Sequence, residues 1–282
     1  MSDNPHTMPA VFVGHGSPMT AFEDNPYVTS WRTLGERLPR PRAILAISAH
    51  WYIDGAAVTA GDQPETVHDF YGFPEALYRF RYPAPGSPAL ASRVIELLAP
   101  EPVTASDRWG LDHGAWTVLM HAFPKADVPV VQLSVDRRKS PAEHMALAER
   151  LRPLRDEGVL VMATGNIVHN LRLYDPRGGA AADPVAEGFR KAVQAKLLAH
   201  DHAALADYLA LSPQARLAAP TPDHFLPLLY IAALQDDDEA PTFFNEVTEG
   251  GGVDMTSVLL GAESPSSPLG RRRAPRPKGV GG

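Results

Sequence analysis

The stretch Ala10-Val-Phe-Val-Gly14-His15-Gly16-Ser17-Pro18 decides how the rest of this chain is interpreted. Its apolar residues predict a buried strand, and a histidine held between two glycines follows in a tight loop that presents one imidazole. The same pattern recurs at Ala43-Ile-Leu-Ala-Ile-Ser-Ala-His50-Trp51. Parallel strands of one sheet end at a common edge, so we expect these two histidines to meet there.

The remaining segments predict an α/β fold. Apolar runs at 56–60, 128–135 and 159–165 predict further strands, and 25–38, 87–99, 140–156, 183–200 and 203–211 are predicted to be helices. Two closing strands are expected near 242–247 and 253–260. We predict a single domain with a central, mainly parallel (mixed) sheet flanked by helices on both faces.

The end of the chain differs in composition from the rest. Residues 262–282 hold four arginines and one lysine against Glu263 alone, within a Ser/Pro/Gly-rich context. Such a segment has little to bury, so we predict a catalytic domain over 1–261 and a disordered basic tail over 262–282. The tail is +4 within a total of −7, which leaves −11 on the domain and argues against a nucleic-acid-binding surface.

Composition narrows the chemistry that is available. The absence of cysteine removes disulfides, thiolate metal sites and cysteine nucleophiles, whereas 11 histidines supply imidazole ligands. There is no basic-then-apolar leader and no apolar run long enough to span a membrane, so we expect a cytoplasmic protein without membrane contact. The sequence leaves the oligomeric state open.

Ten of the 11 histidines fall into two groups. His6, His121, His144, His200 and His202 lack the special setting of the others and are interpreted as structural. A second group stands where a strand or loop passes into the next element, and it comprises His15, His50, His113, His169 and His224. Five such placements favour one shared polar site, and metal binding is the leading explanation because imidazole is the commonest nitrogen ligand.

Other chemistries fit the residues less well. Gly14-His-Gly-Ser lacks both the lysine of a phosphate-binding P-loop and the glycine spacing of a dinucleotide site. Ser17 precedes a proline and is not set in a G-x-S-x-G elbow, so serine hydrolysis is weakly supported. A zinc hydrolase stays open, since several histidines with Asp223 or a glutamate can hold Zn²⁺ beside a reactive water.

Taken together, the motifs resemble the class III extradiol ring-cleavage dioxygenases, within them the branch called 4,5-DOPA dioxygenase extradiol. The resemblance spans roughly residues 8–261 and is carried in the family's order by Gly14-His-Gly-Ser-Pro18, Ser48-Ala-His-Trp51, His68-Asp-Phe-Tyr-Gly-Phe-Pro74, Asp112-His-Gly-Ala-Trp116, Gly165-Asn-Ile-Val-His-Asn-Leu171 and Asp223-His-Phe-Leu-Pro-Leu228. Each fragment alone is weak, but the ordered set is specific.

The resemblance implies a role for each candidate residue. His15, His50 and His224 would hold one divalent metal ion per chain, Fe²⁺ or Zn²⁺, with His224 where other class III enzymes use a glutamate. His169 would be the acid/base residue or a fourth ligand, and His113 would hydrogen-bond the substrate or the oxygen intermediate. Phe70, Tyr71 and Phe73 would enclose the substrate ring.

The implied activity is that of an oxidoreductase, in which O₂ opens the ring of a DOPA-like catechol at an extradiol bond. Two alternatives stay open at this point. One is a zinc-dependent hydrolase built on the same histidines, and the other is a non-catalytic metal-binding scaffold on the same fold. Retention of all five histidines argues against the scaffold, which needs the shape of the pocket but not its imidazoles.

Overall fold

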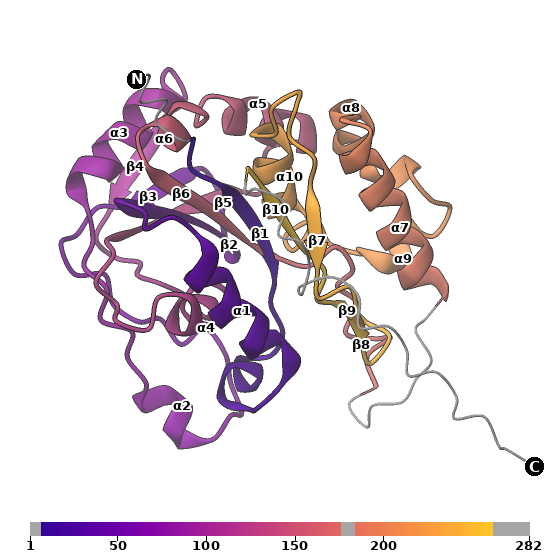
Figure 1. The fold of residues 1–282 in the computed structure, drawn as a ribbon, viewed down its shortest axis with the longest axis horizontal. Helices are drawn as coiled ribbons and strands as arrows, with labels where there is room; N and C mark the ends of the chain where they lie inside the picture. Colours follow the sequence, from indigo (N-terminus) through magenta and orange to yellow (C-terminus); the bar gives the residue numbers. More distant parts are fainter. Residues whose placement is uncertain (1–6, 176–183, 262–282) are drawn as a thin grey trace, which may run out of the picture.

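One sheet organises the protein in the computed structural model, which describes residues 7–175 and 184–261 (Figure 1). Its strand order is β4-β3-β5-β2-β6-β1-β10-β7. The strands span Val103–Ser106 (β4), Ala56–Thr59 (β3), Val130–Asp136 (β5), Ala43–Ile53 (β2), Val159–Gly165 (β6), Ala10–Gly14 (β1), Ser257–Leu260 (β10) and Thr242–Phe244 (β7). A separate hairpin pairs β8 (Thr248–Glu249) with β9 (Val253–Asp254).

The centre of the sheet is parallel and its flanks are not. β5, β2, β6 and β1 run parallel, while β3 is antiparallel to β5, and β10 is antiparallel to both β1 and β7. This mixed sheet confirms the predicted fold class. In the register of the central strands, Gly14 lies opposite Gly165 and Ser48 lies opposite Thr164, so β1 and β6 end together beside Ser48, and β2 continues past them to Ile53.

Each face of the sheet carries a layer of helices, because strand side chains alternate between the faces and the central strands are apolar on both. Ala10 and Phe12 of β1 belong to the buried cluster that also holds side chains of α3 (Pro88–Leu98), α5 (Pro141–Glu149), α7 (Pro184–Leu198) and α10 (Leu226–Ala233). Val11 and Val13 face the other way, toward α1 (Pro26–Arg37) and α4 (His113–Ala122). Figure 1 shows α1 and α4 together on one side of the sheet.

Shorter elements complete the described chain, and two predicted helices are broken. The helix predicted over 140–156 ends at Glu149 and a new helix, α6 (Pro153–Asp156), begins at Pro153, which lacks the amide proton that a continuous helix needs. The segment 203–211 divides into α8 (His202–Ala206) and a 3₁₀ turn, η2 (Tyr208–Ala210). The others are η1 (Pro18–Phe22), α2 (Glu75–Arg79) and α9 (Ala215–Ala218).

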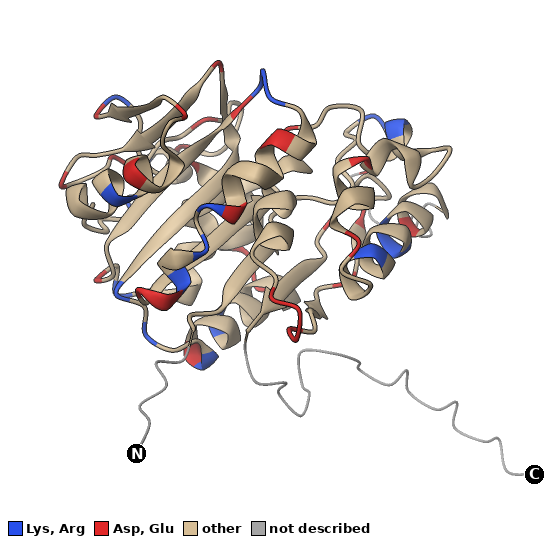
Figure 2. Cartoon of the chain, turned by 90° about the horizontal axis from the view of Figure 1, so that it is seen from above, with Lys and Arg blue, Asp and Glu red and all other residues tan. Residues whose placement is uncertain are grey.

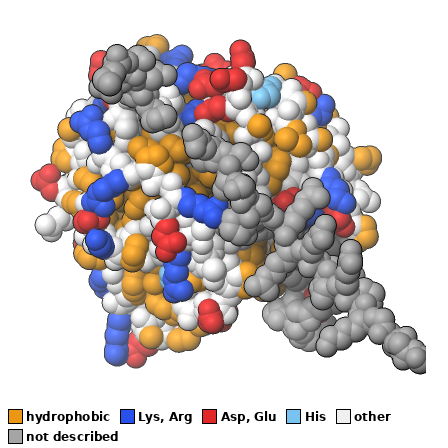
Figure 3. All heavy atoms as spheres, in the orientation of Figure 1, with side chains coloured by type: hydrophobic (Ala, Val, Ile, Leu, Met, Phe, Trp, Pro, Cys, Tyr) orange, Lys and Arg blue, Asp and Glu red, His pale blue; other side chains and the backbone are white. Residues whose placement is uncertain are grey.

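The surface of the described domain mixes both signs of charge. Lys and Arg are interspersed with Asp and Glu along the helices and loops in Figure 2, and apolar side chains lie between them on the face shown in Figure 3. None of the helices in the described ranges is long and apolar enough to cross a membrane. The tail predicted over 262–282 and His6 lie outside the described residues.

Candidate functional site

The five histidines predicted to share one site converge at one edge of the sheet; they are His15, His50, His113, His169 and His224. His15 follows β1, His169 lies four residues beyond β6, and His50 sits in β2 where its register against β5 shifts. Because β6 pairs with both β1 and β2, the three chain segments emerge side by side. His113 is the first residue of α4, and His224 lies just before α10.

Two glycines allow the close approach that this convergence needs. A Cβ atom on Gly165 would lie 2.2 Å from the carbonyl oxygen of His224, and one on Gly114 would lie 2.5 Å from Ser48 Oγ. Contacts this short are not tolerated without a shift of the backbone or side chain. The glycines next to the predicted histidines therefore have a packing reason as well as a turn-forming one.

The imidazoles form one tight cluster. His15 Nε2 and His50 Nε2 are 2.9 Å apart, and the ring centres of His50 and His113 are 3.9 Å apart. His224 lies 5.1 Å from His50 and 5.6 Å from His15 by ring centres. The ring of His169 stacks on that of His224 at 3.5 Å with an angle of 6° between the planes.

Two carboxylates accept hydrogen bonds from the Nδ1 atoms of three imidazoles, on the side of each ring that faces away from the cluster. Asp69 Oδ2 accepts from His50 Nδ1 at 3.0 Å and from His113 Nδ1 at 2.9 Å, while Oδ1 accepts from the backbone N–H of His113 at 2.9 Å. Asp223 Oδ2 accepts from His224 Nδ1 at 2.5 Å. With Nδ1 donating, the Nε2 atom of each ring keeps its lone pair, which is how a carboxylate orients a metal-ligating histidine.

The pKa values of the clustered histidines are shifted in different directions: four are lowered and that of His50 is raised. Burial lowers the pKa values of His15, His113 and His224, and neighbouring imidazoles lower them further. Burial lowers the pKa of His169 to about 3, with His224 as the next cause. Burial also opposes charge on His50, yet the hydrogen bond to Asp69 and the carboxyl group of Asp112 raise its pKa. The site thus concentrates lone pairs and favours a positive charge among them.

These features fit a divalent cation. Imidazole ligands lie about 2.0–2.1 Å from a bound metal, so two of them come to about 3 Å from each other, as His15 and His50 do. His15 Nδ1 is buried without a hydrogen-bond partner, which leaves Nε2 as the nitrogen that faces the cluster. Potential ligand atoms group as His15 with His50 and His113, and as His169 with Asp223 and His224.

A cavity of about 410 Å³ opens over the imidazoles. Phe70 and Phe73, both predicted to contact the substrate, line it, but Tyr71 is 92% exposed and does not. Gly72, with φ of +78°, turns the chain between them and leaves the intervening tyrosine outside. All five histidines line this cavity, together with Asn166, Leu171, Tyr174, Glu249 and Val253 among others.

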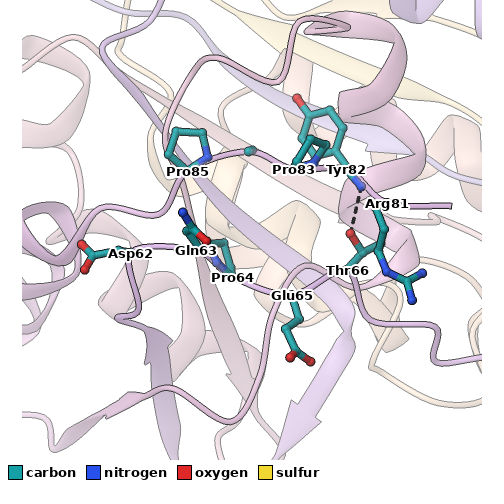
Figure 4. Close-up of a pocket in the computed structure, with 10 residues that line it drawn as sticks. Asp62, Gln63, Pro64, Glu65, Thr66, Arg81, Tyr82, Pro83 and Pro85 are labelled. Atoms are coloured by element: carbon teal, nitrogen blue, oxygen red, sulfur yellow. Dashed lines mark hydrogen bonds between the residues drawn. The ribbon is translucent and has the colours of Figure 1, made fainter. Parts of the chain in front are cut away.

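A larger cleft of about 560 Å³ lies elsewhere, between residues 62–66 and 81–85 (Figure 4). Its side chains include Glu65 and Arg81, and Tyr82 N donates to Thr66 Oγ1 at 2.9 Å. It contains no histidine and no cluster of potential metal ligands among the described residues. The larger cavity is therefore not the one that holds the potential metal ligands.

The histidines interpreted as structural stay out of the cluster where the structure describes them. His144 is fully buried and contacts the Tyr230 hydroxyl at 3.0 Å, and His121 contacts the carbonyl of Ala21 at 2.7 Å. His200 and His202 both lie beside the amide of Gln235. Each has an ordinary hydrogen-bond partner.

Sequence reasoning missed the residues that serve the histidines. Asp69 belongs to the motif His68-Asp-Phe-Tyr-Gly-Phe-Pro74, but no sequence pattern indicates that its carboxylate binds two imidazoles from other elements. Asp223 was considered as a metal ligand, and it instead holds the outer nitrogen of His224. Glu249 enters the cavity from the small hairpin, for which the sequence offered no signal.

Comparisons with known proteins agree with this geometry. The chain matches the family described as the catalytic LigB subunit of aromatic ring-opening dioxygenase over residues 9–258. It is 49% identical over 258 residues to the 4,5-DOPA dioxygenase extradiol of Escherichia coli K12, covering 90% of this chain and 95% of that protein. The protein of the same name from Beta vulgaris is 37% identical over 249 residues, covering 85% and 91%.

A solved structure is also similar. The crystal structure of an uncharacterized protein from Escherichia coli K12 superimposes with a TM-score of 0.80 at 44% sequence identity. The match covers 90% of this chain and 99% of that one.

Proposed function

Because the chain belongs to the family of the catalytic LigB subunit of aromatic ring-opening dioxygenases, and is an extradiol ring-cleaving enzyme, we propose that it opens a DOPA-like catechol in the histidine cavity. The observation that supports this most is the cluster of five imidazoles, three of them held by carboxylates, at the end of a cavity with aromatic walls. Relatives named 4,5-DOPA dioxygenase extradiol support the choice of catechol.

Family members depend on a metal, and we propose that His15, His50 and His224 hold it here, because the Nε2 atoms of His15 and His50 meet and the ring centre of His224 lies within 5.6 Å of both rings. Their Nε2 atoms lie on the cavity side, and Asp69 and Asp223 fix two of the rings from behind. When bound, Fe²⁺ would supply the site for both catechol oxygens and for O₂. Zinc has no redox chemistry, so iron is the metal we propose for turnover.

His169 is the proposed base for a catechol hydroxyl. Burial and the stacked ring of His224 lower its pKa and keep its imidazole unprotonated, so a ring nitrogen is free to accept a proton from a catechol hydroxyl that a bound metal would make more acidic. The backbone of His169 is fixed by its N–H bond to the carbonyl of Ala218 at 3.0 Å. The same imidazole, once protonated, can return the proton as the ring opens.

His113 and the aromatic residues position the substrate in this proposal. Asp69 occupies Nδ1 of His113, which leaves Nε2 to hydrogen-bond a substrate oxygen. Phe70 and Phe73, whose ring centres are 5.1 Å apart, pack edge to face and give the catechol ring an apolar wall that excludes water.

Alanine variants separate ligands from acid/base residues. We expect His15→Ala, His50→Ala and His224→Ala to lose the metal, measured by elemental analysis after iron loading. His169→Ala should keep the metal and lose about 10²- to 10⁴-fold in turnover. His202→Ala, outside the cavity, is the matched control and should keep both. Full metal retention in His15→Ala refutes the ligand assignment, and metal loss in His169→Ala moves that residue into the ligand set.

A further inference from the structure

The charges that line the cavity are one-sided. Glu249 is its only carboxylate, and no lysine or arginine is among the described residues that line it. Glu249 also forms no ion pair with a lysine or arginine in the part of the chain that the structure describes. Apart from the imidazole cluster at the other end of the cavity, nothing in its described lining supplies a positive charge to this carboxylate, so a ligand that brings a cation to it would be favoured.

The β8–β9 hairpin places Glu249 in the wall of the cavity, in line with Val253 and His169. His169 forms a β-bridge with Val253, and Val253 lies opposite Glu249 in the β8–β9 pair. Residues directly opposite each other across antiparallel strands project to the same face, so the three side chains form a row, and all three line the cavity. Neighbouring strands lie about 4.8 Å apart, which puts Glu249 about 10 Å from the histidine along this row.

Two sets of contacts hold Glu249 in place. The hydroxyl of the buried Tyr27 acts on its carboxylate and lowers the pKa of Glu249, and burial keeps the tyrosine hydroxyl protonated by raising its own pKa. The hairpin is attached to the loop after β6 by Asn170 N to Gly252 O at 2.8 Å and by Asp175 N to Gly250 O at 2.9 Å. The loop that carries His169 and the hairpin that carries Glu249 therefore form one unit.

The charge of Glu249 is poorly compensated. Burial raises the pKa of Glu249, the Tyr27 hydroxyl lowers it, and the nearby Glu23 raises it again. A cation placed beside the carboxylate would offset both the cost of burying its charge and the repulsion from Glu23. An anion placed there would add to them.

We propose that Glu249, oriented by Tyr27, binds the ammonium group on the tether of the substrate and selects amine-bearing catechols over catechol carboxylates. This rests on the proposed function, in which the catechol ring lies over the imidazoles. From there, a two- or three-atom tether at the ring runs along the His169–Val253–Glu249 row toward the carboxylate. An ammonium group bound in this way makes a charge-assisted hydrogen bond, whereas a carboxylate at the same place meets a like charge.

The test uses the iron-loaded full chain and three catechols that differ in their tether. These are dopamine, 3-(3,4-dihydroxyphenyl)propionate and 4-methylcatechol, with kcat and KM taken from oxygen uptake. The wild type should prefer dopamine to the propionate by more than about tenfold in kcat/KM, the effect of one charge-assisted hydrogen bond. Glu249→Gln should lose that preference, mainly through KM for dopamine, and should leave 4-methylcatechol within about threefold.

Two further variants separate recognition from folding. Glu249→Asp keeps the charge and should retain part of the preference, and Tyr27→Phe should weaken it without abolishing it. An equal loss on all three catechols in Glu249→Gln means a structural role and overturns the proposal, as does an unchanged preference. A wild type that opens 4-methylcatechol but does not discriminate refutes this inference alone, whereas one that opens no catechol refutes the proposed function and this inference with it.

Discussion

Replacing Asp69 by asparagine tests how much of the metal centre depends on its outer hydrogen bonds. The carboxylate accepts three bonds at once, from His50 Nδ1 at 3.0 Å, from His113 Nδ1 at 2.9 Å and from the His113 backbone at 2.9 Å. Asparagine offers one oxygen and an NH₂ group, and the NH₂ group meets an N–H donor. At least one imidazole must then rotate or change its tautomer.

The expected cost is a 10- to 100-fold loss of metal affinity, as for other residues that orient metal-ligating histidines. By the relation of tenfold to about 1.4 kcal/mol, this is about 1.4–2.8 kcal/mol of binding free energy. Competition of the apoprotein against a chelator, followed under anaerobic conditions with Fe²⁺ and separately with Zn²⁺, measures it. Asp62→Asn is the matched control, because Asp62 is exposed and lines the separate cleft. An unchanged affinity in Asp69→Asn would refute the idea that this carboxylate organises the centre.

Three further predictions concern stability and the chain end. Burial lowers the pKa of His144 to about 4, so its neutral form stabilises the fold and that contribution is lost as pH falls from about 6.5 toward 4. In His144→Phe, the free energy of unfolding should therefore fall by about 3 kcal/mol less over this pH range, as measured by urea unfolding at several pH values. Gly165→Ala forces a Cβ against the His224 carbonyl and should cost about 1–3 kcal/mol and lower the metal content, whereas full stability and metal content would contradict the packing argument. Deleting residues 262–282 should leave turnover and Tm nearly unchanged, and a large loss of either would show that the tail belongs to the folded enzyme.

The sequence carried the fold because apolar runs and helical periodicity alternate along the chain. That alternation implied a parallel centre, and the parallel centre implied that His15, His50 and His169 meet at one edge, as they do. The family resemblance added the roles proposed for them. The prediction of one continuous helix over 140–156 is wrong at Pro153, although a proline inside a helical pattern is itself a sequence signal for a break.

The residues around the histidines were hidden for a different reason. Asp69, Tyr71 and Glu249 lie in segments without helical or strand periodicity, where side-chain direction depends on single turns such as that at Gly72. Asp69 acquires its role only when β2 and α4 bring His50 and His113 to it. Contacts of this kind join elements that are distant in sequence, and no local pattern specifies them.

The most direct test of the account is to strip the protein of metal, reload it anaerobically with Fe²⁺ or Zn²⁺, and admit O₂ with L-DOPA. Oxygen uptake and the NMR spectrum of the product are then followed together. We expect only the iron-loaded protein to consume one O₂ per L-DOPA and to form a yellow product with an aldehyde proton, as cleavage beside the diol requires. Absence of oxygen uptake with iron, or a product without an aldehyde, would contradict extradiol cleavage in the histidine cavity.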